Sequence, residues 1–266
     1  MNMMPSQGQS LATLDKIRGI GSALSIGMSV VSKRLPFATY HHADTNAGSG
    51  MNDEVSSIVG EPVYGSPVVA VRAAEAAGLQ RFNGLFCEID AGRAKTLATR
   101  HLANRADCKV LCGDNAELLP VFARSIRDYG DNPKYAVGSI MVDPNGWFRR
   151  NKNQVGVPVT ELIAFCAEFP RIDVVLNLNV RTYQLMAAEP EKYNAMPPRE
   201  IMAALGKAHW LVSAPKSVGG DRFVLMIGRN FPTGDHKRIG LFRAESEQGR
   251  LALLVMEGKR QGQMDL

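Results

Sequence analysis

Acidic residues stand at the ends of four successive stretches that have the composition of buried strands. A carboxylate held at a strand end can accept hydrogen bonds from hydroxyl, amine or ammonium groups of a ligand. One or two such ends arise easily by chance, whereas four in order indicate one binding site. The stretches are residues 37–43, 82–89, 108–112 and 136–142, and the acids are Asp44, Glu88 with Asp90, Asp114, and Asp143.

The first of these ends opens into a loop of small residues. Residues 40–50 read Y-H-H-A-D-T-N-A-G-S-G. Gly48 and Gly50 lack a Cβ atom, so the backbone can turn tightly there and a ligand can approach it closely. Taken alone, the stretch also fits an ordinary turn between a strand and a helix. The acidic ends of the later strands favour the ligand loop.

The helices predicted between the strands determine where these ends meet. Strands that alternate with helices imply parallel pairing, with helices on both faces of the sheet. Right-handed connections bring the carboxyl ends of the strands to one edge, and ligands bind there where the strand order reverses. We expect helices at residues 66–77, 92–104, 116–129, 160–169 and 197–205, and further strands at residues 172–178, 209–214 and 223–228.

Three details near the loop complete this picture. Ser66 is expected to cap the helix in which Pro67 takes the favoured first position. Residues 51–64 are polar and aperiodic and predict a long loop, either a lid over the site or a surface insertion. His41 and His42 alternate across the first strand and are expected to be core or surface residues.

The order of these motifs resembles that of class I S-adenosylmethionine-dependent methyltransferases. D-x-x-A-G-x-G, an acidic second strand end, G-D-N after the third strand and D-P-x-G after the fourth are similar to that family over residues 36–230. The resemblance implies a Rossmann-like α/β fold with a mostly parallel, seven-stranded sheet and helices on both faces. More narrowly, G-S-P-V-V-A-V and V-D-P-N-G are similar to the three-Cys-motif partner (TcmP-like) family.

The resemblance also implies roles for individual residues around an S-adenosylmethionine cofactor. Asp44, Ala47, Gly48 and Gly50 would surround its methionine part. Glu88 would hold the ribose hydroxyls, with Asp90 as the alternative. Asp114 would accept a hydrogen bond from the adenine amino group, and Asn115 and Cys112 would flank the adenine ring. By contrast, a dinucleotide-binding G-x-G-x-x-G loop would need a third glycine where Asp53 stands, which disfavours hydride transfer.

Residues 143–148, D-P-N-G-W-F, resemble a degenerate form of the D-P-P-Y motif of amino-group nucleic-acid methyltransferases. The predicted activity is therefore methyl transfer to an amino group of a nucleic-acid base, of the DNA adenine type. An alternative is a strand-to-turn junction with a core tryptophan and a solvated basic loop. The implied catalytic residues are Asp143, Pro144 and Asn145, and the implied substrate-binding residues are Trp147 and Phe148 for base stacking and Arg149 and Arg150 for phosphates.

Two other functions stay open: methylation of a small molecule or protein, and nucleic-acid binding without catalysis. The net charge of +5 and the pI near 9.1 are compatible with DNA or RNA as partner without requiring either. Nothing in the sequence indicates an oligomeric state.

The 266 residues are sufficient for one large domain with appendages. We expect an N-terminal helical extension at residues 1–35, a methyltransferase-like domain at 36–235 and a C-terminal extension at 236–266. The apolar run before Lys33 is too short and too rich in glycine and serine for a membrane span, which predicts a cytoplasmic protein. The four cysteines are scattered without a C-x-x-C pair, which predicts buried free thiols and no metal site.

Overall fold

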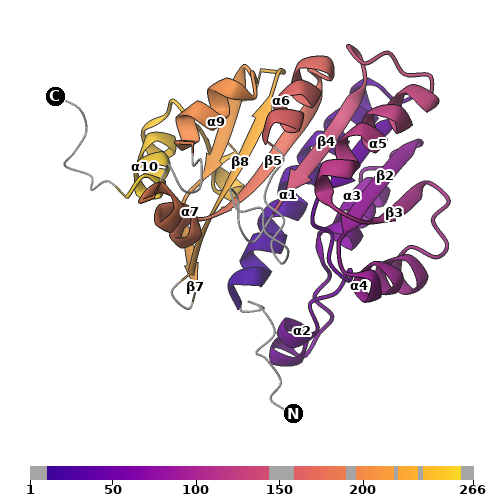
Figure 1. Ribbon diagram of the computed structural model, residues 1–266, viewed down its shortest axis with the longest axis horizontal. Coiled ribbons are helices and arrows are strands. Elements are labelled where there is room, and N and C mark those ends of the chain that lie inside the picture. The colour runs from indigo at the N-terminus through magenta and orange to yellow at the C-terminus, as the bar shows by residue number, and fades with distance from the viewer. Residues whose placement is uncertain (1–10, 144–158, 190–195, 219–220, 233–235, 259–266) are drawn as a thin grey trace.

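A single β-sheet forms the centre of the computed structural model, which describes residues 11–143, 159–189, 196–218, 221–232 and 236–258 (Figure 1). The strands are β1 (Tyr40–Asp44), β2 (Phe82–Glu88), β3 (Cys108–Cys112), β4 (Val137–Val142), β5 (Ile172–Asn179), β6 (His209–Ser213), β7 (Lys216–Val218), β8 (Asp221–Arg229) and β9 (Leu241–Arg243). Of the five strands of its parallel part, β1, β2, β4 and β5 are largely or fully buried, and β3 is partly exposed.

The described sheet has nine strands, eight of them in the order β3-β2-β1-β4-β5-β8-β6-β9, with β7 paired to β8. The pairs from β3 to β5 are parallel, and every pair that includes β8, β6, β9 or β7 is antiparallel. The Rossmann-like α/β prediction is confirmed, whereas the predicted seven-stranded, mostly parallel sheet is wrong. The additional strands β7 and β9 have three residues each, too few for a periodic pattern to reveal them.

The register places the carboxyl ends of the central strands at one level. Asp44, the last residue of β1, lies opposite Phe86 of β2 and Met141 of β4. The strand order reverses between β1 and β4, because β2 and β3 follow on one side of β1 and β4 and β5 on the other. The predicted convergence of the acidic strand ends is confirmed, and ligands of such sheets bind at this reversal.

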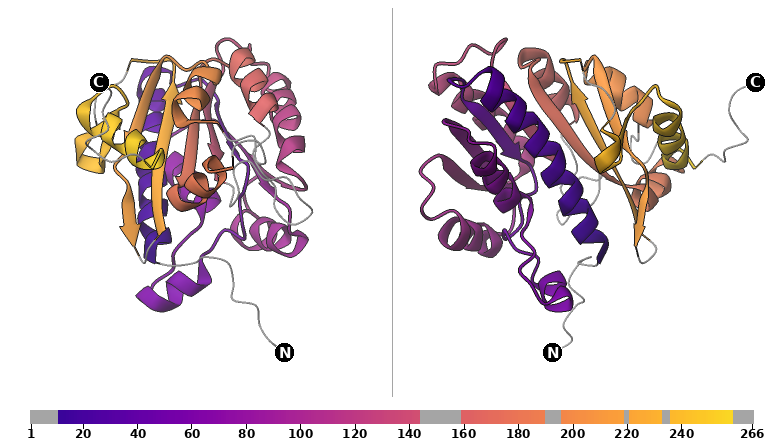
Figure 2. Two further views of the ribbon diagram at one scale, coloured as in Figure 1. Left: turned by 60° about the vertical axis from the view of Figure 1, so that its left-hand side comes forward. Right: turned by 180° about the vertical axis from the view of Figure 1, so that it is seen from behind.

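Helices cover both faces of the sheet, as predicted (Figure 2). Phe122, Phe165 and Phe169 stack in the core between the sheet and the helices of one face. On the other face, buried residues of α1 and α3 meet the aromatic residues of β1 and β2. The helices of the first face are α5 (Asn115–Asp128), α6 (Val159–Glu168), α7 (Val180–Ala187), α9 (Pro198–Ala204) and α10 (Glu247–Met256), and those of the second are α1 (Leu11–Arg34), α3 (Ser66–Ala76) and the π-helical turn η1 (Leu97–His101).

Helix α1 crosses the sheet diagonally and lies in the second core, as the right-hand view of Figure 2 shows. Ile20, Leu24 and Met28 are buried there at a spacing of four residues, about one helical turn. At the other end of the chain, β9 pairs with β6, and α10 contributes Leu253 and Met256 to the first core. The stretches expected as terminal extensions therefore contribute directly to the sheet and its two cores.

Residues 51–64 contain a short helix, α2 (Asp53–Val59), where the sequence predicts a loop. A bridge between Met51 and Tyr64 closes the base of this excursion, and Val55 is fully buried within it. Its seven residues are too few for a helical hydrophobic pattern to be recognised against polar neighbours. Helix α2 projects beyond the sheet edge near α4 (Ala91–Thr96) in Figure 1.

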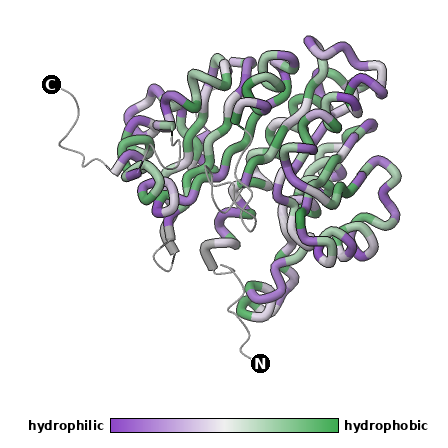
Figure 3. The backbone as a smooth tube through the Cα atoms, in the orientation of Figure 1, coloured by the Kyte–Doolittle hydropathy of each residue, from purple (hydrophilic) through white to green (hydrophobic). Residues whose placement is uncertain are grey.

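The hydropathy of the chain follows this layering, with hydrophobic residues along the central strands and hydrophilic residues in many of the connecting loops (Figure 3). Within the described part of the chain, no helix combines the length and the apolar character needed to cross a membrane.

Candidate functional site

The loop after β1 is organised by the buried carboxylate of Asp44. Its Oδ1 accepts the backbone N–H of Asn46 at 3.0 Å, and its Oδ2 accepts the hydroxyl of Ser66 at 2.6 Å. The predicted capping role of Ser66 is wrong, because Gly65 occupies the N-cap and Ser66 points back to β1. Pro67 does lie in the first turn of α3, as expected.

Both glycines of this loop adopt left-handed backbone conformations, with φ of 65° at Gly48 and 86° at Gly50. A Cβ atom at Gly50 would come within 2.9 Å of Leu97 and His101, so Gly50 permits close packing against η1. A Cβ atom at Gly48 would meet nothing within 4 Å. Of the two predicted ligand-contacting glycines, Gly48 therefore borders open space, and Gly50 serves the packing of the loop.

Glu88 joins the end of β2 to the glycine loop. Its Oε2 accepts the backbone N–H of Gly48 at 2.8 Å, and its Oε1 accepts that of Asp90 at 2.9 Å. The guanidinium of Arg93 lies 3.1 Å from Oε1. An ionised carboxylate offers about four acceptor positions, so these contacts leave capacity for ligand hydroxyls beside Gly48.

Asp90 and Asp114 are both engaged at helix starts. Asp90 accepts the N–H of Arg93 at 2.8 Å and caps α4. Asp114 accepts the N–H of Ala116 at 2.8 Å and caps α5, whose first residue, Asn115, is buried. The Gly113 N–H donates to the Glu88 carbonyl at 3.2 Å, which keeps the ends of β2 and β3 together.

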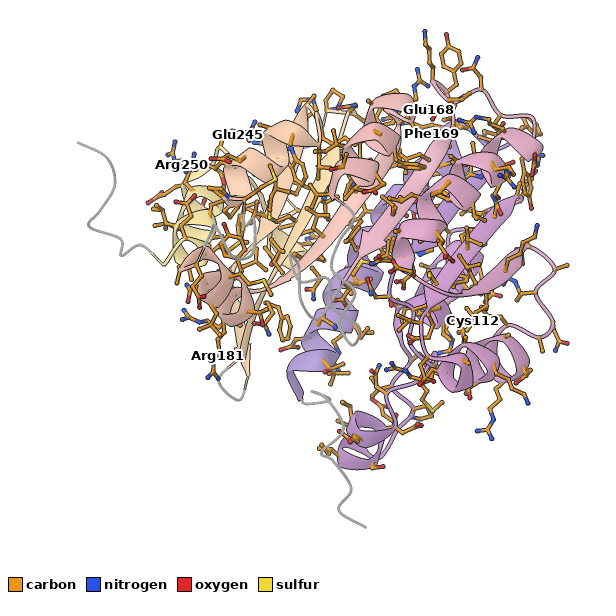
Figure 4. The ribbon with its side chains drawn as sticks, viewed as in Figure 1. Cys112, Glu168, Phe169, Arg181, Glu245 and Arg250 are labelled. Atoms are coloured by element: carbon orange, nitrogen blue, oxygen red, sulfur yellow. The ribbon has the colours of Figure 1, made fainter. Side chains whose placement is uncertain are left out.

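The four cysteines are free, but they are not all buried as predicted. Cys87 and Cys166 are buried, whereas Cys112 is exposed at the end of β3 (Figure 4). Strand β3 is an edge strand of the sheet, so its last side chain has a neighbouring strand on one side only. Cys112 is the last residue of β3 and lies opposite Glu88, the last residue of β2, so it lies at the carboxyl ends of the strands together with Glu88 and Asp114.

Asp143 lies directly after β4, across the strand reversal from Asp44. Lys16 of α1 forms an ion pair with its Oδ2 at 2.8 Å, and the amide of Asn177 in β5 donates to its Oδ1 at 2.7 Å. Neither partner is predicted from the sequence. Lys16 precedes an apolar run and Asn177 interrupts an apolar strand, but these features alone do not indicate a contact with Asp143.

The electrostatics of the site couple these groups. Burial, and to a smaller extent the nearby carboxylate of Asp143, raise the pKa of Asp44 to about 6, against the opposing effects of the Ser66 hydroxyl, the Asn46 N–H and the Lys16 ammonium. Two carboxylates and one ammonium therefore share the region where the strand order reverses.

Replacing Asp44 by asparagine should raise stability at neutral pH and remove part of the pH dependence. The native state binds the Asp44 proton more tightly than the unfolded chain, so this group's contribution to the free energy of unfolding falls as the pH rises from about 4 to about 6. The upward shift corresponds to about 3 kcal/mol. Asparagine keeps an acceptor for Asn46 and can donate to the Ser66 oxygen.

The measurement is urea unfolding of both proteins from about pH 4 to about pH 8, a range that brackets the raised pKa of Asp44. The variant should be more stable at the upper end and should converge with the wild-type protein at the lower end. Asp173 has a pKa raised to about 6 by burial in both proteins, so only the difference between them is informative. Parallel pH profiles would contradict the assignment of a shifted Asp44.

The two histidines of β1 do not belong to this site. His41 bonds to Asp131 at 2.8 Å and His42 to Ser139 at 2.9 Å, and both rings are buried, which is the core alternative of the two predicted. Burial lowers the pKa of His42 to about 3, so it is neutral at physiological pH. Among the residues with described positions, no group of three or more His, Cys, Asp or Glu could hold a metal ion.

The remaining residues of the D-P-N-G-W-F motif and the basic residues after it fall outside the described part of the chain. Their predicted roles stay predictions. These residues are Pro144, Asn145, Trp147, Phe148, Arg149 and Arg150.

Comparisons with known proteins support the fold. No protein-family model and no curated protein matches the chain. A crystal structure of a DUF519 family protein from Legionella pneumophila matches with a TM-score of 0.51 and 13% identity, covering 92% of this chain and 93% of that one. This similarity, over nearly the full length of both proteins, shows a shared fold.

Two further solved structures are similar at lower scores. A DUF574 family protein from Streptomyces avermitilis has a TM-score of 0.44 and 11% identity, covering 80% of this chain and 83% of its own. Magnesium protoporphyrin IX methyltransferase from Synechocystis with bound SAM has a TM-score of 0.42 and 11% identity, covering 81% and 80%. The narrower resemblance to the three-Cys-motif partner family finds no match among these structures.

Proposed function

We propose that this protein is an S-adenosylmethionine-dependent methyltransferase that acts on an amino group of a nucleic-acid base, with the adenine amino group as the expected acceptor. One arrangement carries the proposal. The glycine loop and Glu88 lie at the ends of adjacent strands β1 and β2, and Asp143 lies beside them at the end of β4. A cofactor at the ends of β1 and β2 and an acceptor amine at Asp143 would then lie on the two sides of the strand reversal.

The residues present fit the adenosyl part of the cofactor. Open space beside Gly48 adjoins the Glu88 carboxylate, which can accept hydrogen bonds from a ribose diol. Asp114 and Asn115, one strand further along, supply polar groups for the adenine ring. Asp44 is fully buried and bonded to Asn46 and Ser66, so we assign it to holding the loop in shape.

The cofactor, when bound, supplies an activated methyl group on a sulfonium, so the protein mainly has to align a nucleophile with it. Asp143 is suited to accept a hydrogen bond from the amine that receives the methyl group, because it is partly exposed at a strand end. Lys16 and Asn177 hold its two oxygens and thereby fix the orientation of the carboxylate.

The nucleic-acid acceptor rests on the D-P-N-G-W-F motif and on the positive net charge of the chain. A direct test incubates the purified protein with S-adenosylmethionine carrying a tritiated methyl group and, separately, with DNA, RNA or a protein extract. The proposal predicts label in DNA or RNA. Label in protein or in small molecules alone would show that the methyl acceptor is a protein or a small molecule and not a nucleic acid. Cofactor binding without any transfer would indicate a non-catalytic protein.

Lys16→Met should lower the rate of methyl transfer by roughly tenfold, because a single charge-assisted contact contributes about 1.5–3 kcal/mol. Methionine preserves the length and apolar stem of the side chain but removes the ammonium that orients Asp143. The affinity for S-adenosylmethionine should change less than the rate. Rates are measured at saturating cofactor with the tritium assay.

Arg18→Met is a matched control, because Arg18 lies on the same helix and its side chain is 65% exposed. It should leave the rate unchanged. Equal rates for Lys16→Met and the wild-type protein would remove Lys16 from the site.

A further inference from the structure

The sheet edge opposite the candidate site carries a row of exposed aromatic and basic residues. Its members flank the ends of five neighbouring strands, taken in the order β2, β1, β4, β5 and β8. Phe37, Tyr135 and Phe231 are 79%, 64% and 43% exposed, which is unusual for large aromatic side chains. We call this set the amino-edge row, and its members are Arg81, Phe37, Tyr135, Arg171 and Phe231.

The centre of the amino-edge row is a stack of three side chains. The guanidinium carbon of Arg171 lies 5.0 Å from the ring centroid of Tyr135 and 5.7 Å from that of Phe231. Both distances are within the range of cation–π contacts. The guanidinium therefore joins two rings that both keep a large exposed surface, and it orders them without covering them.

Positive charge surrounds the amino-edge row. Glu168 is paired with Arg127 and Asp107 with Arg105. Asp131 bonds to the His41 ring, whose pKa burial lowers, so this contact brings no positive charge. Asp128 and the partly exposed Asp131 remain as acids of this region. The exposed or partly exposed basic residues along this edge are Lys33, Arg34, Arg81, Lys134 and Arg171.

We propose that the amino-edge row binds single-stranded nucleic acid by stacking its bases on Phe37, Tyr135, Arg171 and Phe231. Bases stack on aromatic rings and on guanidinium planes, and basic neighbours attract the phosphates. Neighbouring strands lie about 4.8 Å apart, so five strand ends span about 20 Å, enough for several nucleotides. The proposal adds a second contact for the acceptor class of the proposed function, and binding at this row does not depend on methyl transfer.

The test measures fluorescence anisotropy of a fluorescein-labelled single-stranded RNA of about twelve nucleotides, together with the same sequence as single-stranded DNA and as a duplex. The full-length protein should bind both single strands more tightly than the duplex, whose bases are already stacked. Tyr135→Ala and Phe231→Ala should each weaken single-strand binding at least roughly fivefold, the effect of losing one base stack.

Two matched controls separate the amino-edge row from general surface effects. Leu185→Ala removes an apolar side chain that is 63% exposed on α7. Arg171→Ala should also weaken single-strand binding, and Arg250→Ala is its control. Arg250 is exposed on α10, away from Glu168 and Phe169, which precede Arg171 in the chain (Figure 4). Both controls should bind like the wild-type protein.

Wild-type affinity in Tyr135→Ala and Phe231→Ala, or no single-strand binding at low salt, would overturn the proposal. So would sedimentation of the wild-type protein as a dimer that Tyr135→Ala converts to a monomer with unchanged RNA affinity, because the row would then join two copies of the chain. The binding assay contains no S-adenosylmethionine, so single-strand binding that Tyr135→Ala and Phe231→Ala weaken supports the row whether or not the protein transfers methyl groups.

Discussion

Replacing Asp143 by alanine is expected to lower the rate of methyl transfer by about a thousandfold, within the range that positioned acid–base groups contribute. Asp143 is the described residue of the D-P-N-G-W-F motif, and Lys16 and Asn177 hold its two oxygens. Without the carboxylate, the amine that receives the methyl group loses the group that aligns it by accepting its hydrogen bond. The affinity for S-adenosylmethionine should fall much less than the rate.

The fold should survive this change, because Asp143 follows β4 at the partly exposed edge of the sheet and not in either core. Circular dichroism melting checks this point. Asp143→Asn is the matched variant, since it keeps the shape and the contact with Asn177 but loses the charge that pairs with Lys16. An Asp143→Ala protein with full transfer activity in the tritium assay would contradict the catalytic assignment.

Replacing Glu88 by alanine is expected to weaken S-adenosylmethionine binding by tenfold to a hundredfold, as measured by isothermal titration calorimetry. About one acceptor position of the carboxylate is left for the ribose, so one charge-assisted hydrogen bond of about 1.5–3 kcal/mol would be lost. The glycine loop would also loosen, because the N–H groups of Gly48 and Asp90 would lose their acceptor. A lower melting temperature should therefore accompany the weaker binding.

Asp90→Ala is a matched control for Glu88→Ala. It removes a carboxylate two residues away that caps α4, and it should cost about 1 kcal/mol of stability. Its cofactor affinity should stay within about twofold of the wild-type value, a ratio worth less than RT. If calorimetry gave the same affinity for Glu88→Ala and the wild-type protein, Glu88 would not be the ribose ligand.

The parts of the fold that the sequence predicts are those set by local patterns. Strand β3 is observed at residues 108–112, as predicted, and the predicted limits of β2, β4 and β5 differ by one residue at most. Buried parallel strands are continuous apolar runs between helices with distinct ends, so both composition and spacing identify them. The meeting of Asp44, Glu88, Asp114 and Asp143 at one edge then follows from the handedness of the connections.

The parts that the sequence does not predict depend on contacts between distant segments. Lys16 and Asp143 are 127 residues apart, and no local pattern relates a lysine in a helix to an acid at a strand end. Ser66 is a good cap by residue type, but its hydroxyl finds the buried Asp44 instead. Strand β9 forms only because β6 offers a free edge that three residues can complete.

The central claim is that the adenosyl group of the cofactor binds at the carboxyl ends of β1, β2 and β3. A crystal structure of the protein grown with S-adenosylhomocysteine tests this claim most directly. We predict the ribose hydroxyls within hydrogen-bond distance of the Glu88 carboxylate, the backbone of Gly48 against the ligand, and the adenine ring beside Asn115. An adenosyl group bound elsewhere on the molecule, with Glu88 and Gly48 making no contact to it, would contradict the claim.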